Sequence, residues 1–247
     1  MASVILPAKV GGASFVVYAG RVGGVPTAEA FACLLIARLL DLATLALGMA
    51  IACLALASTH AYPGLPWLGV VGGVLLPASL LLFAASARGD LLVRMASGAS
   101  RALGFGRTKT GTRLLAASER IGDALRAAGA RGRLLEATLL SLPAWVCVFL
   151  YCAILARGLG LPQETTFAQA TFGSGLAILT TLLPVSAFAN FGTLEAGWVL
   201  GFHALGVGTD LAYSTGVGLH LVQIANTVLL GVLGHVGMAL FGDRPKA

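Results

Sequence analysis

The chain has 247 residues, of which 57% are hydrophobic and only 11% are charged, and its formal net charge is +6. Soluble domains carry about 25% charged residues, so this composition excludes a soluble globular protein and predicts a multi-pass membrane protein. The basic residues are concentrated in one stretch, which indicates membrane topology, and we expect no nucleic-acid partner.

In chain order, the sequence predicts an all-α bundle with four spans and two broken apolar segments. Residues 1–26 are apolar but contain proline and several glycines, so we expect an embedded or interfacial segment that does not cross the membrane. Residues 167–205 are apolar but are interrupted by Pro184, Asn190, Gly192 and Glu195. The four spans are expected at residues 28–58, 68–87, 134–156 and 211–241.

The distribution of Lys and Arg residues predicts the orientation of the chain in the membrane. Residues 88–133 contain ten basic residues, so the positive-inside rule places this loop in the cytoplasm. The C-terminal tail, with Arg244 and Lys246, is expected on the same side. We therefore expect a single membrane domain over residues 1–247 in the plasma (inner) membrane. It has a first half (1–87), the basic loop (88–133) and a second half (134–247).

Two stretches of the chain resemble each other. Each opens with Leu-Pro, at Pro7 and Pro184, and each reaches Gly-Val before a long apolar run. The second Gly-Val lies 182 residues after the first, and the same offset pairs Arg38 with His220 and Asp41 with Gln223. Three spans separate the copies, so they have opposite orientations and predict an inverted repeat with two re-entrant segments. A chance likeness between glycine-rich apolar segments is the alternative.

The second broken segment contains the carboxylate of Glu195. A helix beginning near Thr193, capped by its hydroxyl, would place Glu195 in the first turn, where the helix dipole favours an anion. Gly197 and Gly201 form a GxxxG face suited to close helix packing. Glu195 is either a structural carboxylate bonded to a partner helix, or a group that faces a wet path and binds a cationic headgroup or a proton.

Further polar residues lie inside the predicted spans. Arg38 and Asp41 are three residues apart, so they share a helix face and can pair. They form either an internal ion pair or a site where Arg38 holds a lipid phosphate. His220 and Gln223 are expected to line the same path. The candidate substrate-binding residues are therefore Glu195, Arg38, Asp41, His220, Gln223 and Asn190.

Catalytic and metal-binding motifs are missing from the sequence. It contains no nucleophile elbow, P-loop or HExxH motif, and the four histidines have no cysteine or carboxylate at ligand spacing. We therefore expect no enzyme activity, no catalytic residues, no metal and no cofactor.

The motif "LPVSAFANFGTLEAGW", followed by "LGVGTDLAYSTGVGLHLV", resembles the lysylphosphatidylglycerol synthase transmembrane region, or flippase-like domain family. The N-terminal "LPAKVGG" and "GGVPTAEAFACLLIARLLDL" resemble the first-half pattern of that family. The resemblance maps the motif glutamate to Glu195, its proline to Pro184 and the first-half arginine to Arg38. The first motif often reads Gly-Glu in the family but is Gly11-Gly12 here, so one half of a symmetric acidic pair is missing. Members usually carry about two spans ahead of this motif, so we expect either a short member or an incomplete chain, and either would leave a groove uncovered.

The resemblance implies a stand-alone member, without the synthase domain, that binds and moves a lipid or lipid-linked glycan across the inner membrane. The implied partners are an anionic phospholipid or a polyprenyl-linked or hopanoid-type lipid. A protein partner would be a second copy of the chain, in a homo-oligomer, or a lipid-modifying enzyme. The alternative is a non-transporting scaffold subunit of a lipid-modifying pathway that acts through the basic loop.

Overall fold

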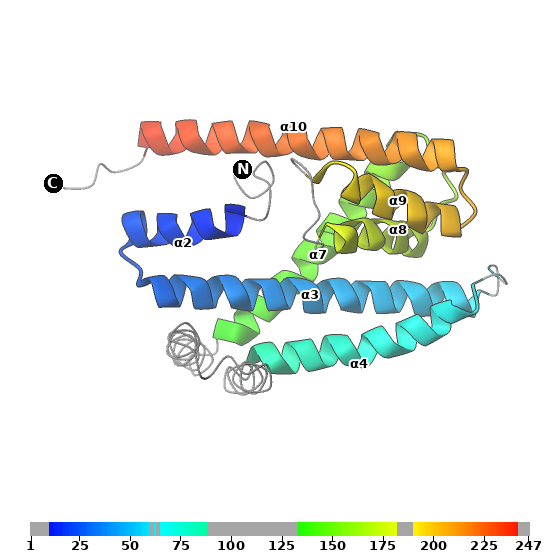
Figure 1. Ribbon diagram of the computed structural model, residues 1–247, viewed down its shortest axis with the longest axis horizontal. Helices are drawn as coiled ribbons and strands as arrows, with labels where there is room; N and C mark the ends of the chain where they lie inside the picture. Colours follow the sequence, from blue (N-terminus) through cyan, green and yellow to red (C-terminus); the bar gives the residue numbers. More distant parts are fainter. Residues whose placement is uncertain (1–9, 60–61, 63–64, 88–132, 182–189, 242–247) are drawn as a thin grey trace, which may run out of the picture. The chain divides into compact units, whose positions relative to one another are not determined.

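A computed structural model describes residues 10–59, 62, 65–87, 133–181 and 190–241. These residues form seven α-helices and no strand (Figure 1). The helices are α2 (Val10–Gly23), α3 (Thr27–Ser58), α4 (Trp67–Ala87), α7 (Arg133–Gly158), α8 (Phe167–Thr180), α9 (Thr193–Ala204) and α10 (Thr209–Phe241).

Four of these helices are long and apolar enough to cross a membrane. They contain the candidate spans Glu29–Ser58, Trp67–Ala84, Leu135–Gly158 and Thr209–Gly237, with mean hydropathies between 1.7 and 2.2. Each coincides with one of the four spans expected from the sequence. The described helices and these four candidate spans confirm the prediction of an all-α, multi-pass membrane protein.

Several sequence predictions lie outside the described residues. Pro7 and Pro184 are among them, as are nearly all of the basic loop and the C-terminal tail. The roles predicted for those segments therefore stay predictions.

The glycines near the N-terminus do not interrupt the helix there. Helix α2 runs through Gly11 and Gly12, and the chain leaves the helix only at Gly24. A glycine inside a helix costs about 1 kcal/mol relative to alanine, which is not enough to end it. Gly24 has φ +62°, the left-handed conformation that ends helices, and Pro26 then has no N–H to continue the pattern.

The chain divides into two compact units, of residues 15–151 and of residues 1–14 with 152–247. A single domain over residues 1–247 therefore stays a prediction. In the first unit, α3 packs closely on α4, because Gly72 of α4 allows the Leu54 side chain of α3 to approach its backbone. Gly48 of α3 accommodates the Phe149 ring of α7 in the same way.

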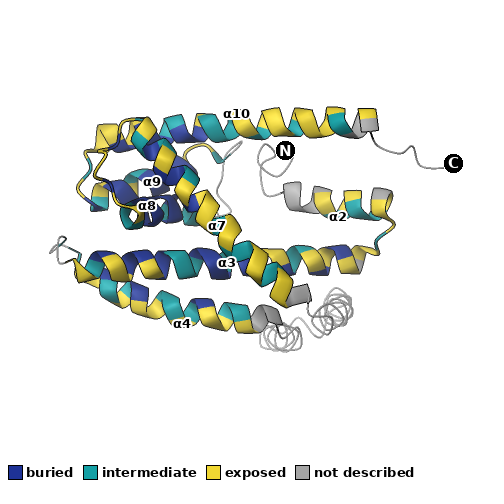
Figure 2. Cartoon of the chain, turned by 180° about the vertical axis from the view of Figure 1, so that it is seen from behind, coloured by how far each residue is buried: buried dark blue, intermediate teal, exposed yellow. Residues whose placement is uncertain are grey.

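The second unit is built around the helices α8 and α9. Gly201 of α9 approaches Gly173 of α8, while Gly197 approaches Ala177, so the two helices form an antiparallel hairpin. The N-terminus of α8 is fixed by a capping box, in which Thr166 and Gln169 exchange hydrogen bonds between side chain and backbone. Figure 2 shows that α8 and the inner face of α9 are largely buried.

Helix α10 packs against α9 through the indole of Trp198. This side chain is fully buried, lies against Gly216 and donates a hydrogen bond from Nε1 to Thr215 Oγ1 at 3.2 Å. The small residues of α8, α9 and α10 thus bring three helices close enough for polar groups of one to reach another.

The Gly201–Gly173 contact gives a direct test of the hairpin. A Cβ atom on Gly201 would lie 2.7 Å from Gly173 Cα, so we expect Gly201→Ala to lower the free energy of unfolding by about 1–3 kcal/mol. Gly234→Ala on α10 is the control, because its Cβ would meet no other atom of the described residues within 4 Å. Thermal unfolding of the detergent-solubilised protein measures both. Equal midpoints for the two variants would contradict the close packing.

Candidate functional site

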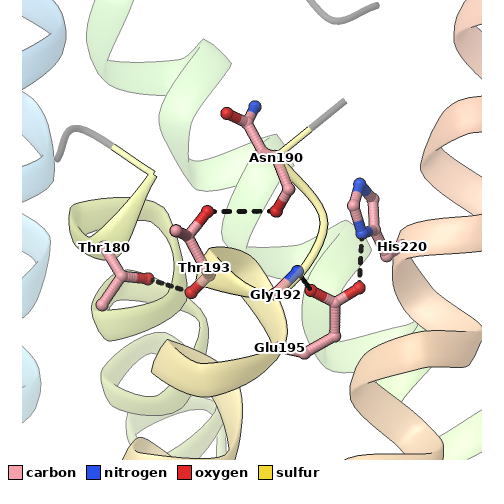
Figure 3. Close-up of polar contacts among 6 residues, drawn as sticks. All are labelled: Thr180, Asn190, Gly192, Thr193, Glu195 and His220. Carbon is pink, nitrogen blue, oxygen red and sulfur yellow. Dashed lines mark hydrogen bonds and ion pairs between the residues drawn. The ribbon is translucent and has the colours of Figure 1, made fainter. Parts of the chain in front are cut away.

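The chain enters α9 through two residues in the left-handed region. Asn190 has φ +62° and Gly192 has φ +88°, so the backbone turns sharply before the helix begins. The Thr193 hydroxyl donates to the Asn190 carbonyl at 3.0 Å. The Thr180 hydroxyl, at the end of α8, donates to the Thr193 carbonyl at 2.7 Å (Figure 3). These bonds fix the start of α9 against the end of α8.

The carboxylate of Glu195 folds back onto the start of its own helix. The N-cap residue is Gly192 and not Thr193, which corrects the sequence prediction, because the Thr193 hydroxyl is bonded to Asn190 instead. Glu195 Oε2 accepts a hydrogen bond from the Gly192 N–H at 2.8 Å. This is the carboxylate half of a capping box, in a position where the helix dipole also favours a negative charge.

The other oxygen of the same carboxylate contacts α10. Glu195 Oε1 lies 2.6 Å from His220 Nδ1, and the two residues are only 5% and 2% exposed. A hydrogen bond at this distance requires one proton between the carboxyl group and the imidazole. The ring of Phe191 lies against the imidazole, with centroids 4.5 Å apart. One buried side chain thus joins the break, the start of α9 and the middle of α10 (Figure 3).

A groove opens beside this carboxylate. It has a volume of about 560 Å³ and lies between α9 and α10. Its walls are mostly apolar, and Glu195 is the ionisable residue on α9 that borders it. The lining residues are Phe191, Gly192, Glu195, Ala196, Val199, Leu200, Tyr213 and Val217. Apolar walls with a polar group at one place are typical of sites that bind amphipathic molecules.

The structure brings part of the predicted set together. Glu195 and His220 are in contact, and Gln223 lies one helical turn beyond His220 on the same side of α10. Asn190 is adjacent through its backbone, but its side-chain amide points away from the Glu195 carboxylate (Figure 3). Asn190 therefore contributes through its backbone, in the turn that precedes α9.

Arg38 and Asp41 form their own cluster in the other unit. Arg38 Nη1 lies 3.4 Å from Asp41 Oδ2, and the side chains are 60% and 41% exposed. Asp41 Oδ1 also accepts from the indole Nε1 of Trp145 at 3.2 Å, which ties α3 to α7. The pairing expected from the sequence is present. Arg38 keeps enough exposed surface to meet a further anion.

Three aromatic residues of these clusters were not predicted from the sequence. Phe191 and Tyr213 border the groove, and Trp145 holds Asp41. Tyr213 lies seven residues before His220, two helical turns, so it shares a face with His220 and could have been found. Phe191 and Trp145 act through tertiary contacts that no spacing in the sequence indicates.

The chemistry available at Glu195 is that of a hydrogen-bond acceptor. A carboxylate has about four lone-pair positions, of which the Gly192 N–H and His220 use two, so an approaching amine or hydroxyl can still donate to it. Among the described residues, no group of three or more His, Cys, Asp or Glu is placed to hold a metal ion.

The two bonds of Glu195 predict a graded response to mutation. Glu195→Leu removes the acceptor of the Gly192 N–H, and we expect it to destabilise the protein by about 1–3 kcal/mol. Glu195→Gln keeps an oxygen for that N–H and should cost less. Thermal unfolding in detergent measures the difference, with the exposed Glu164→Leu as the control. If Glu195→Leu were as stable as Glu164→Leu, the carboxylate would not hold the start of α9.

The chain was compared with protein families, curated proteins and solved structures. A family model, the lysylphosphatidylglycerol synthase TM region, matches residues 1–231. The searches of curated proteins and of solved structures each found no match. The family match covers nearly the whole chain, including both motifs and the Glu195–His220 pair. The chain is therefore a membrane protein that belongs to the lysylphosphatidylglycerol synthase transmembrane-region family.

Proposed function

We propose that this protein binds a lipid or a lipid-linked glycan and translocates it across the inner membrane. The observation that carries the proposal is the buried Glu195 carboxylate, which borders an apolar groove at a break in the helical chain. Ionisable residues inside membrane segments are costly and mark substrate or ion pathways. The groove receives the hydrocarbon part of the cargo, and Glu195 meets donors on its headgroup.

The helix lengths support a re-entrant arrangement of α8 and α9. With 14 and 12 residues, these helices are about 21 and 18 Å long, shorter than the hydrocarbon core of about 30 Å. They run antiparallel, so a chain that enters the bilayer along α8 returns along α9 to the same side. Such irregular backbone is tolerated in a membrane where it is covered by protein or lines a cavity.

The helix boundaries support the internal repeat. Helix α3 begins at Thr27 and α10 at Thr209, the offset of 182 residues that aligns the two sequence copies. Each long helix follows a short one across a glycine with positive φ, Gly24 at +62° and Gly206 at +89°. Three candidate spans, α3, α4 and α7, lie between the copies, and an odd number of spans supports opposite orientations of the two copies.

The charge pattern supports the choice of cargo and membrane. Ten basic residues between positions 88 and 133 favour a cytoplasmic loop beside anionic lipid. The exposed guanidinium of Arg38 has the forked donors that suit a phosphate. An anionic phospholipid or a polyprenyl-linked or hopanoid-type lipid has the required apolar body and polar head. The protein moves this cargo without covalent chemistry, so we do not propose an enzyme.

The proposal predicts loss of lipid movement when Glu195 loses its charge. We expect Glu195→Gln, reconstituted in proteoliposomes, to abolish transfer of a fluorescent anionic phospholipid between leaflets while folding and inserting normally. A membrane-impermeant quencher measures the transfer. Glu164→Gln removes a carboxylate outside the site and should keep full transfer. Normal transfer by Glu195→Gln would overturn the proposal.

The scaffold alternative predicts the opposite ranking of variants. If the protein only anchors a lipid-modifying enzyme, neutralising Arg107, Lys109 and Arg113 in the basic loop impairs function more than Glu195→Gln does. If the translocase proposal holds, Glu195→Gln is the more damaging change in the same assay.

A further inference from the structure

We propose that the groove between α9 and α10 selects its lipid by hydroxyl groups of the headgroup, which donate hydrogen bonds to Glu195, and not by the negative charge of a phosphate. The chemical class of the ligand is therefore a lipid whose headgroup is a polyol or a sugar. This inference rests on the proposed function for the groove as the place where cargo binds, and it adds which part of the cargo is recognised there.

The Glu195 carboxyl group offers the groove hydrogen-bond acceptors only. Its Oε2 atom accepts from the Gly192 N–H at 2.8 Å, and its Oε1 atom lies 2.6 Å from His220 Nδ1. The proton that the second contact requires lies between the two side chains. A molecule in the groove therefore meets the lone pairs that these two bonds leave unused, and the group that matches them is a donor.

The walls of the groove lack the partners that a phosphate needs. None of the described residues that line it is lysine, arginine or histidine. The start of α9 would otherwise favour an anion, but the Glu195 carboxylate already occupies that position. A phosphate beside Glu195 would be a buried negative charge without a cation, which is costly. Such an unpaired charge disfavours the wrong ligand and so gives the site specificity.

The order of groups along the groove suits a lipid with its headgroup at Glu195. Helices α9 and α10 run antiparallel, because Glu195 contacts His220 while Trp198, further along α9, contacts the earlier Thr215. Glu195 therefore lies at the end of the groove next to the break, and Tyr213 lies toward the other end. The length between them is lined by apolar side chains of both helices, which suit hydrocarbon.

A hydroxyl fits this acceptor better than an ammonium group does. An ammonium carries a charge and three donors, whereas a hydroxyl is neutral and carries one donor. Among the described lining residues Glu195 is the one carboxylate, and the Tyr213 hydroxyl lies toward the other end of the groove. The apolar walls beside Glu195 would leave donors of a buried ammonium unsatisfied, which costs free energy. A single hydroxyl donor is satisfied by the carboxylate alone.

The first experiment compares two competitors that carry the same charge. Proteoliposomes of phosphatidylcholine contain the purified protein and a trace of chain-labelled fluorescent phosphatidylglycerol, and a membrane-impermeant quencher measures its transfer between leaflets. Unlabelled phosphatidylglycerol and phosphatidylethanol have equal negative charge, but only the first has headgroup hydroxyls. We expect phosphatidylglycerol to halve the transfer at about a tenfold lower mole fraction, the lower end of the range for a hydrogen bond to a charged group.

Two further competitors test the phosphate and the ammonium. Monogalactosyldiacylglycerol has a sugar and no phosphate, and it should inhibit as well as phosphatidylglycerol does. Phosphatidylethanolamine has an ammonium and no headgroup hydroxyl, and it should inhibit no better than phosphatidylethanol. Equal inhibition by phosphatidylglycerol and phosphatidylethanol would overturn the selection by hydroxyl groups while the proposed translocation stands. Stronger inhibition by phosphatidylethanolamine than by phosphatidylglycerol, or none by the galactolipid, would overturn it as well.

Binding to variants assigns the preference to Glu195. Detergent-solubilised protein is equilibrated with equal amounts of phosphatidylglycerol and phosphatidylethanol, and native mass spectrometry measures the ratio of the two lipids bound. We expect a ratio of about ten for the wild-type protein and for the control Glu164→Gln, and loss of the preference in Glu195→Gln. If Glu195→Gln kept the wild-type ratio, the assignment to Glu195 would be wrong.

The binding ratio does not depend on lipid movement. If the wild-type protein transfers no fluorescent lipid in proteoliposomes, the proposed translocation fails, and the binding ratio alone decides the selection by hydroxyl groups. A wild-type protein that binds the two lipids equally would then overturn it.

Discussion

The break in the chain before α9 leaves backbone N–H groups at the start of that helix without helical partners, and the Glu195 carboxylate accepts from one of them. In a bilayer, an unsatisfied backbone group costs several kcal/mol, so a break of this kind is stable only with such a partner. The carboxylate itself then needs a partner, and His220 on α10 supplies it. The arrangement of α9 relative to α8 and α10 depends on this chain of hydrogen bonds.

Close packing of small residues makes these bonds possible. Gly201 and Gly197 bring α9 onto α8, and Gly216 brings α10 onto the indole of Trp198. Lipid tails are as apolar as the helix surfaces, so hydrophobic burial gives little drive for helices to associate in a membrane. Van der Waals contact across the glycines and a few interhelical hydrogen bonds hold the three helices together. The groove lies between α9 and α10, where Val199, Leu200 and Tyr213 line it.

The two acidic residues in polar clusters show two ways to keep a carboxylate in an apolar region. Asp41 is partly exposed and is held by Arg38 from its own helix and by Trp145 from α7. Glu195 is buried and is held by a backbone N–H and by the imidazole of His220 on α10. The first arrangement suits a fixed anchor between helices. The second places a buried carboxylate at the edge of the groove.

The sequence by itself determined the helical class, the four spans and the position of Glu195 in the first turn of α9, because apolar length and helix-terminus chemistry are local properties. The starts of α3 and α10 differ by 182 residues, the offset between the two similar stretches, while the repeat itself stays a prediction. Only the tertiary structure decided that His220 is the partner of Glu195, since 25 residues and a turn separate them. It likewise decided that Gly192 takes the N-cap position, that Trp145 holds Asp41, and that Phe191 lies on the imidazole. Contacts of this kind depend on how helices pack, which local patterns of residues do not determine.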